Sequence, residues 1–157
     1  MSVRKITTIA LIASIYAVVT WAVAPLSYGP IQLRISEILT VLPFITPLAV
    51  PGIFIGVVVA NLLSPVGIFD IIFGSLASLL AAWLTAKMPH RWLAPLPPVI
   101  INAVIIGILL GILGDVSIFA AMLYVGLGQL IVCYGLGLPF LILLERYRDQ
   151  IPGGRNQ

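Results

Sequence analysis

The sequence predicts an all-α integral membrane protein, a six-transmembrane-helix bundle with its N- and C-termini in the cytoplasm. The chain has 157 residues, of which 61% are hydrophobic and only 8% are charged. Soluble domains are about 45–50% apolar and about 25% charged, so this chain lacks the polar side chains that would cover it in water. Because a crossing takes about 20 residues, the length allows one bundle of five or six spans and no separate soluble domain.

Four of the spans are continuous apolar stretches. The first covers residues 6–26. We expect it to stay in the protein as a transmembrane helix and not to be cleaved as a signal peptide, because it is longer than the roughly 7–15-residue apolar core of a signal peptide. The last three cover residues 68–86, 93–114 and 116–144. The last stretch is longer than a bilayer requires, which predicts a tilt, a kink at its glycines or an extension into the cytoplasm.

The uncharged stretch at residues 38–69 is too long for a single crossing. As one helix it would reach roughly 48 Å, whereas the hydrocarbon core is ~30 Å thick. Proline breaks or begins helices, and the stretch contains Pro43, Pro47, Pro51 and Pro65. We therefore expect two short helices joined near the segment TPLAVPG.

The distribution of charge predicts the number of spans and their direction, because positive residues near span ends mark the cytoplasmic side. Three groups of cations share one side only if residues 35–63 cross twice: Arg4 and Lys5; Lys87 and Arg91; and Arg146, Arg148 and Arg155. This requirement gives six spans with both termini inside. The transmembrane domain is then residues 1–147, and residues 148–157 form a polar, frayed cytoplasmic tail. The net charge of +3 therefore reflects the cations on the cytoplasmic side. It does not indicate a nucleic-acid partner, and we expect none.

The outer side then carries four charged residues, and each has a simple structural role as an alternative to a role in a site: Arg34, Glu37, Asp70 and Asp115. Arg34 and Glu37 either form a local surface pair or line an outward-facing cavity. Asp70 either caps the N-terminus of its helix or faces the same cavity, whereas capping is the favoured role of Asp115.

Three amide side chains lie within the predicted spans, where a polar group must face protein, a cavity or a partner. Asn61 lies near the outer end of its span. Asn102 and Gln129 lie at similar depths in neighbouring antiparallel spans, where they either hydrogen-bond each other or face a ligand. Tyr28, close to the outer carboxylates, offers a stacking face.

Small residues follow one face of the first span at helical spacing: Ala10, Ala13, Ser14 and Ala17. Such a stripe lets another helix approach closely. It either packs inside the chain or forms a docking face for another membrane subunit.

The sequence contains none of the motifs that would indicate an enzyme or a motor. It has no GxxxxGK[ST] phosphate-binding loop, no HExxH zinc motif and no GxSxG nucleophile motif. With Cys133 and His90 as the only residues of their kinds, we expect no metal site and no cofactor. A small membrane chain with an outer polar cavity and no ATPase motif is typical of a binding subunit of a larger machine.

Residues 28–82 contain several short motifs in a specific order: QLRISE, LPF, PGIFIG, ANLL and FDIIFGSLASLLAA. In these motifs the chain resembles the QueT family of queuosine-precursor transporters, while the last two spans match mainly in hydrophobic pattern. The resemblance implies a substrate-binding S-component of an energy-coupling factor (ECF) transporter in a prokaryotic plasma membrane. It also implies docking on a transmembrane T-component with two ATPase subunits. The family's docking face is an A-x-x-x-A pattern on the first helix, which Ala13 and Ala17 match and which Ala10 and Ser14 match with one serine.

The cargo implied by the resemblance is a 7-deazaguanine precursor, and its chemistry suits the predicted site. Glu37 or Asp70 would accept the adjacent N1–H and amino donors of the ring. An amide would donate to the ring carbonyl, and Tyr28 would stack on the ring. The outer side, with one cation and three acids, has a net charge of −2, which favours a cationic aminomethyl precursor.

Three alternatives stay open from the sequence. In the first, the chain is an S-component for another small metabolite, such as a vitamin. In the second, it is a small homo-oligomeric ion-coupled carrier or channel that uses Glu37 and Asp70. In the third, it is an assembly subunit that transports nothing.

Overall fold

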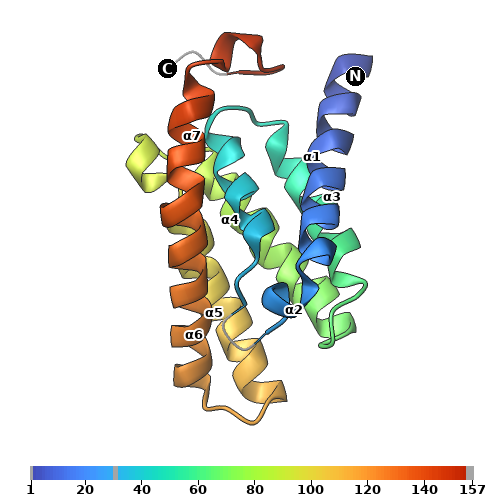
Figure 1. Ribbon diagram of the computed structural model, residues 1–157, viewed down its shortest axis with the longest axis vertical. Helices are drawn as coiled ribbons and strands as arrows, with labels where there is room; N and C mark the ends of the chain where they lie inside the picture. The colour runs from blue at the N-terminus through green and yellow to red at the C-terminus, as the bar shows by residue number, and fades with distance from the viewer. Residues whose placement is uncertain (1, 30–31, 155–157) are drawn as a thin grey trace.

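The computed structural model describes residues 2–29 and 32–154, and the regular structure in these ranges is entirely helical (Figure 1). The α-helices are α1 (Val3–Ala22), α2 (Ala24–Ser27), α3 (Ala49–Asn61), α4 (Ser75–Thr85), α5 (Leu96–Leu113), α6 (Ile118–Leu130) and α7 (Leu138–Glu145). Three stretches are 3-10 helices: η1 (Ile35–Phe44), η3 (Arg91–Leu93) and η5 (Arg148–Gln150). Two others are π-helical: η2 (Asp70–Gly74) and η4 (Ile131–Gly137).

These elements form one bundle. Helix α1 packs against α3, α5 packs against α6, and α4 lies against both α3 and α5. The η1 segment contacts α1, α4 and η4, which places it in the interior. The described ends of the chain lie at the same end of the bundle (Figure 1).

Three helices within the described residues are long and apolar enough to cross a membrane: Val3–Ala22, Arg91–Leu113 and Ile118–Glu145. Three further apolar helices are shorter, namely Ile35–Phe44, Ala49–Asn61 and Asp70–Thr85. The all-helical fold is therefore confirmed for the described residues, with three helices that are long and apolar enough to span a membrane. The count of six spans and the orientation of the termini stay predictions.

The uncharged stretch forms two short helices, as its prolines predicted. The 3-10 helix η1 ends at Phe44 and α3 begins at Ala49. The bend between them lies toward the end of the bundle that holds the termini (Figure 1). Ten residues is long for a 3-10 helix, since runs beyond three or four residues are uncommon. Pro43 lies inside η1 and removes one of its backbone donors.

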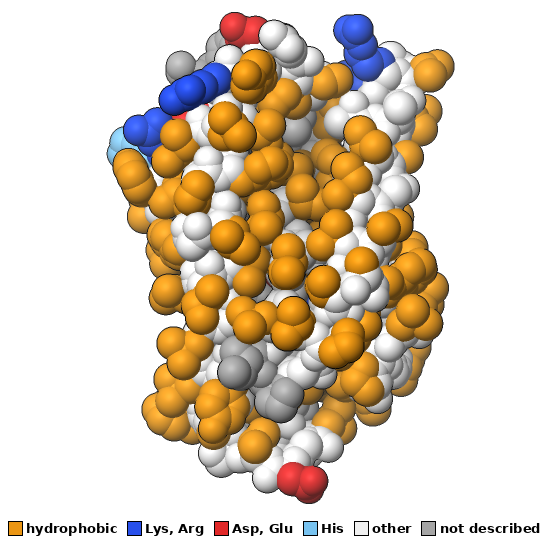
Figure 2. Space-filling view, in the orientation of Figure 1, with side chains coloured by type: hydrophobic (Ala, Val, Ile, Leu, Met, Phe, Trp, Pro, Cys, Tyr) orange, Lys and Arg blue, Asp and Glu red, His pale blue; other side chains and the backbone are white. Residues whose placement is uncertain are grey.

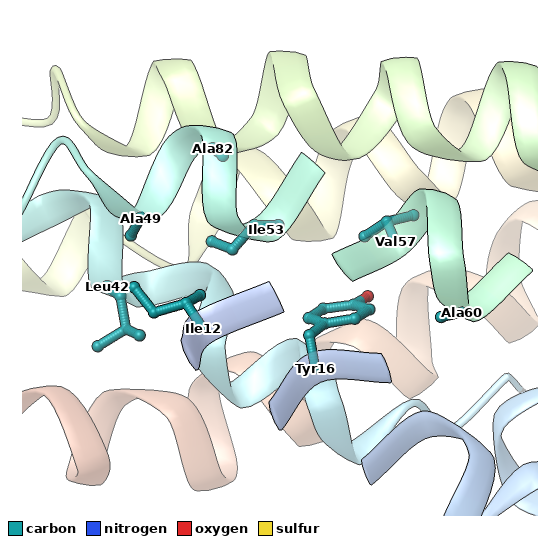
Figure 3. Packing of buried hydrophobic residues seen from close by; sticks show 8 residues of the cluster. All are labelled: Ile12, Tyr16, Leu42, Ala49, Ile53, Val57, Ala60 and Ala82. Atoms are coloured by element: carbon teal, nitrogen blue, oxygen red, sulfur yellow. The ribbon is translucent and has the colours of Figure 1, made fainter. Parts of the chain in front are cut away.

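Helices α1 and α3 meet at a close contact that we call the α1–α3 seam: Gly52 and Gly56 on α3, facing Ile12, Ala13 and Tyr16 on α1. A Cβ atom added at Gly56 would lie 2.8 Å from Tyr16 Cβ and 2.9 Å from the Ala13 carbonyl oxygen. Figure 3 shows the apolar cluster at this seam, in which Ile12 and Tyr16 pack with Ile53 and Val57. The two glycines therefore set how closely and in which rotation α1 docks on the bundle.

The seam divides the predicted stripe of small residues. Ala13 and Ala17 are buried within the chain, whereas Ala10 and Ser14 are exposed. Two of the four residues predicted to dock a partner are thus interior packing residues. The reason is the rotation of α1, which turns its Ala13 and Tyr16 side toward the α3 glycines.

The C-terminal segment packs onto the bundle. Thr46 Oγ1 donates a hydrogen bond to the Pro152 carbonyl at 2.9 Å, and Ile151 packs against an apolar cluster that contains Val41 and Phe44. The expectation of a frayed tail is wrong for residues 148–154, while Arg155 lies outside the described residues. At the opposite end, Ser117 and not Asp115 caps α6, since the Ser117 hydroxyl accepts from the Ala120 N–H at 3.3 Å.

Candidate binding site

A small polar cavity lies inside the bundle, between the start of η1 and helices α4, α5 and α6. Its walls are Gln32, Arg34, Glu37, Gly74, Ser78, Asn102, Ile106, Val125 and Gln129. Its volume is about 10 Å³, which is room for about one water molecule. The structure thus brings four of the seven predicted substrate residues to one place: Arg34, Glu37, Asn102 and Gln129.

Arg34 forms a buried ion pair with Asp70. Its Nη2 donates to Asp70 Oδ2 at 2.8 Å, and its Nε donates to the Ser27 carbonyl at 3.4 Å. The pair ties the residue just before η1 to the first turn of η2. Asp70 therefore serves as the counter-ion of Arg34 and does not cap its helix, and Arg34 pairs across the bundle rather than with its neighbour Glu37.

Glu37 is held by one oxygen only. The Tyr16 hydroxyl donates to Glu37 Oε1 at 2.6 Å, and Glu37 is 1% exposed. Its other oxygen, Oε2, is buried and has no hydrogen-bond partner among the described residues. Because a carboxylate is a pure acceptor, the arrangement leaves a fixed, unused acceptor in the wall of the cavity.

Asn61 and Asp70 lie behind this wall, next to Gly74. Asn61 Nδ2 donates to the Asp70 carbonyl at 2.8 Å, which fixes the first turn of η2. A Cβ atom at Gly74 would lie 2.6 Å from Asp70 Oδ1 and 2.9 Å from Asn61 Nδ2. Asp70 and Asn61 therefore support the cavity. The π-helical turn η2 places Asp70 there, and such turns occur frequently at functional sites.

Asn102 and Gln129 face the cavity from α5 and α6, and each is 3% exposed. Across the described part of the chain, no hydrogen bond joins the two amides. Gln129 Oε1 instead accepts from Cys133 Sγ at 3.4 Å. The pair therefore offers most of its hydrogen-bonding capacity to the cavity.

Tyr28 lies outside the polar cavity. Its hydroxyl donates to the Ala60 carbonyl at 2.6 Å, and Trp21 Nε1 donates to the same oxygen at 3.1 Å. Arg34 Cζ lies 5.3 Å from the centre of the Tyr28 ring, within the range of a cation–π contact. Tyr28 also lines a second, more apolar cavity of about 300 Å³, which shares Gln32 with the polar cavity.

Sequence reasoning missed five residues of the polar cavity: Gln32, Gly74, Ser78, Ile106 and Val125. A signal was present for two of them, because Gly74 and Ser78 follow Asp70 by four and eight residues and so share its face of a helix. Gln32 had no such signal, since its position depends on how the chain before η1 folds back over the cavity.

Comparisons with known proteins give a consistent result. The profile of a family described as the QueT transporter matches residues 6–146. The Queuosine precursor transporter QueT of Lactococcus lactis subsp. cremoris (strain MG1363) is 37% identical over 76 residues. That alignment covers 47% of this chain and 44% of the relative, so the chain matches less than half of that protein's length. No solved structure matches this chain.

Proposed function

Because this chain belongs to the QueT transporter family, we propose that it is the S-component of an ECF-type importer for a 7-deazaguanine queuosine precursor. The observation that carries the proposal is the buried polar cavity, on which η1, α4, α5 and α6 converge. In this proposal the chain binds its substrate from outside the cell. It then docks on a T-component, and two ATPase subunits supply the energy, so the chain itself is not an enzyme.

Two features support six spans with both termini in the cytoplasm of a prokaryotic cell. Figure 2 shows Lys and Arg side chains gathered at the end of the bundle where the described chain begins and ends, and apolar side chains along its height. Arg91 also pairs with Glu145 at 3.2 Å, which joins the loop before α5 to that end. By the positive-inside rule this is the cytoplasmic end. The short helices η1, α3 and η2–α4 then make three crossings, which a locally thinned bilayer accommodates.

The polar residues divide into two roles in this proposal. Asn102 and Gln129 pair with the ring of the substrate, and Glu37 Oε2 accepts an N–H donor of the ligand. Asp70 and Asn61 hold the wall in place, and Tyr28 anchors the chain before η1. Since a cavity of about 10 Å³ is far smaller than a bicyclic ring, binding must separate η1 from α5 and α6.

Ala10 and Ser14 remain available for docking on the T-component. Both are exposed on α1, on the side that faces away from the α1–α3 seam. Their small side chains leave the helix backbone accessible to a partner helix.

The proposal is tested with the purified full chain and a ligand panel of 7-deazaguanine precursors and vitamins, by thermal shift and calorimetry. We expect only the deazaguanines to bind. Gln129→Leu should weaken their binding roughly tenfold or more, because it removes a buried hydrogen bond to the ring. The matched control is Gln150→Leu, an exposed amide at the cytoplasmic end, which should leave the affinity unchanged.

Other outcomes identify the alternatives. Binding of a vitamin alone would keep the S-component role and replace the cargo. Uptake into vesicles by the purified chain without ATPase subunits would indicate an ion-coupled carrier. Absence of binding by every ligand, together with no small molecule found by mass spectrometry of the purified chain, would favour an assembly subunit.

A further inference from the structure

An apolar groove follows one face of α4. Four side chains line it, Leu76, Leu79, Leu80 and Trp83, and its volume is about 390 Å³. Because these residues are spaced by three and four positions, they share one face of the helix over about 10 Å of its length. Leu76, Leu80 and Trp83 are 53%, 44% and 48% exposed, so the groove opens outward from the bundle. With the end of α4 in the cytoplasm, the groove faces the acyl chains of the cytoplasmic leaflet.

A cation without an ion-pair partner lies at the end of this groove. Lys87 Nζ lies 3.3 Å from the centre of the Trp83 ring, which is a close cation–π contact. Within the described ranges Lys87 is in no ion pair, whereas the nearby cation Arg91 is paired with Glu145 at 3.2 Å. Residues 71–114 contain no acidic side chain that could serve as a local partner. The groove therefore ends at one unmatched positive charge.

The turn that carries Lys87 is held by the bundle on both sides. The buried Thr85 hydroxyl donates to the Ala94 carbonyl at 3.0 Å, which joins the end of α4 to the residue after η3. Met88 packs against the apolar cluster that contains Ala94. The backbone that carries Lys87 is therefore fixed relative to Trp83, so the apolar groove and the positive charge keep one arrangement.

We propose that this groove binds an anionic phospholipid of the cytoplasmic leaflet, with an acyl chain along Leu76 and Leu80 and the phosphate next to Lys87. Apolar contact alone would accept any lipid, whereas the unmatched cation favours a negatively charged headgroup. A second copy of the chain fits this face less well, because it would bring a second Lys87 and no acid from residues 71–114 to the contact. The site shares no residue with the polar cavity and is independent of the cargo.

The experiment is native mass spectrometry of the purified full chain in detergent, titrated with phosphatidylglycerol or with phosphatidylcholine of the same acyl chains. Wild type should bind phosphatidylglycerol about fivefold more tightly, which is the effect expected of one lysine beside an anionic headgroup. In Lys87→Gln this preference should fall below about twofold, because the cation next to the headgroup is gone. Lys5→Gln removes an exposed lysine near the start of α1 and should keep the wild-type preference.

A second pair of variants tests the groove itself. Leu80→Trp fills the groove and leaves Lys87 in place. Binding of both lipids should then fall about threefold or more, because less apolar surface is buried against the acyl chain. Leu127→Trp places the same side chain on an exposed face of α6, outside the groove, and should change neither affinity.

Several outcomes would overturn the inference. Equal affinities of wild type for the two lipids, or an equal loss of preference in Lys87→Gln and Lys5→Gln, would show a general effect of the basic end. Unchanged lipid affinity in Leu80→Trp, or displacement of bound lipid by inorganic phosphate alone, would show that the groove takes no part. A dimer peak that Leu80→Trp removes would show that a second copy covers this face. All of these outcomes leave the proposed function intact.

Discussion

The α1–α3 seam and the polar cavity lie on two sides of Tyr16 and are built by opposite means. The seam joins two regular α-helices through glycine-mediated contact, with apolar side chains packed around it (Figure 3). Irregular helix contributes part of the cavity wall, through the 3-10 segment η1 and the π turn η2, and Gln129 lies at the end of α6, just before the π segment η4. The rest of the wall comes from regular turns of α4, α5 and α6. Regular packing maximises contact, whereas irregular helix turns carbonyls and side chains away from their usual positions and makes room for a site.

Unsatisfied polar atoms show the same difference between the two regions. Buried side-chain atoms without a hydrogen-bond partner, among the described residues, are Glu37 Oε2, Asn61 Oδ1, Asp70 Oδ1 and Ser75 Oγ, on residues that line the cavity or lie next to its wall, and two nitrogens of Arg148 in η5. None belongs to a residue of the α1–α3 seam. Natural proteins satisfy nearly all buried polar groups, and exceptions gather where a function needs them. The seam is therefore the part of the molecule that stabilises it, and the cavity is the part that retains free hydrogen-bonding capacity.

The largest effect is expected from a substitution that fills the α1–α3 seam with a side chain. Gly56→Leu places a side chain where even a Cβ atom would lie 2.8 Å from Tyr16 Cβ and 2.9 Å from the Ala13 carbonyl. Because backbone and packed side chains cannot move away cheaply, we expect loss of folded, monodisperse protein in size-exclusion chromatography. Gly135→Leu is the control, since a Cβ there meets no atom within 4 Å. Equal yields of the two variants would show that α1 docks differently.

The second test removes the charge of Asp70, which supports the wall of the cavity through Arg34. Asp70→Asn leaves Arg34 buried without its counter-ion, and breaking a buried pair costs about 3–5 kcal/mol. We expect a lower free energy of unfolding by about that amount in denaturant titrations of the detergent-solubilised protein. Replacing both partners, in Arg34→Met with Asp70→Leu, should recover most of the stability, since an apolar pair carries no desolvation penalty. A double variant no more stable than Asp70→Asn would mean that the pair contributes more than charge balance.

The two regions also differ in how much of them the sequence predicts. The bend between η1 and α3 followed from the prolines and from the need to place all cations on one side. The rule that polar side chains in a span face protein or a cavity made Arg34, Glu37, Asn102 and Gln129 candidates for one cavity, with local pairing as the alternative. These signals are local or compositional, so they can be read from the sequence without knowing how the helices dock.

The partners of these residues were not predictable in the same way. Arg34 pairs with Asp70, which is 36 positions away, although Glu37 is only three away, because η1 is pressed against α4 and not exposed. The division of the small-residue stripe depended on the rotation of α1, which Gly52 and Gly56 set from another helix. Pairings across a bundle depend on how rigid helices dock, and spacing within one helix does not carry that information.

The mildest test concerns the residue that the two regions share. Tyr16 is fully buried, with its ring in the apolar cluster of the seam and its hydroxyl on Glu37 Oε1 at 2.6 Å. Tyr16→Phe keeps the ring and removes only the hydrogen bond, which in membrane proteins is worth about 0.6 kcal/mol on average and up to about 1.7. With a carboxylate as acceptor we expect the upper part of that range in denaturant unfolding.

The same substitution should weaken ligand binding by more than it lowers stability, because Glu37 loses the bond that fixes its position while the seam stays packed. Tyr124→Phe, an exposed tyrosine on α6, is the control for removal of a hydroxyl. If Tyr16→Phe lowers stability as much as Tyr16→Leu, the hydroxyl belongs to the structural part of the molecule, and the division between seam and cavity at Tyr16 is wrong. If binding falls while unfolding changes little, the hydroxyl belongs to the site, because its only described role is then to hold Glu37 toward the ligand.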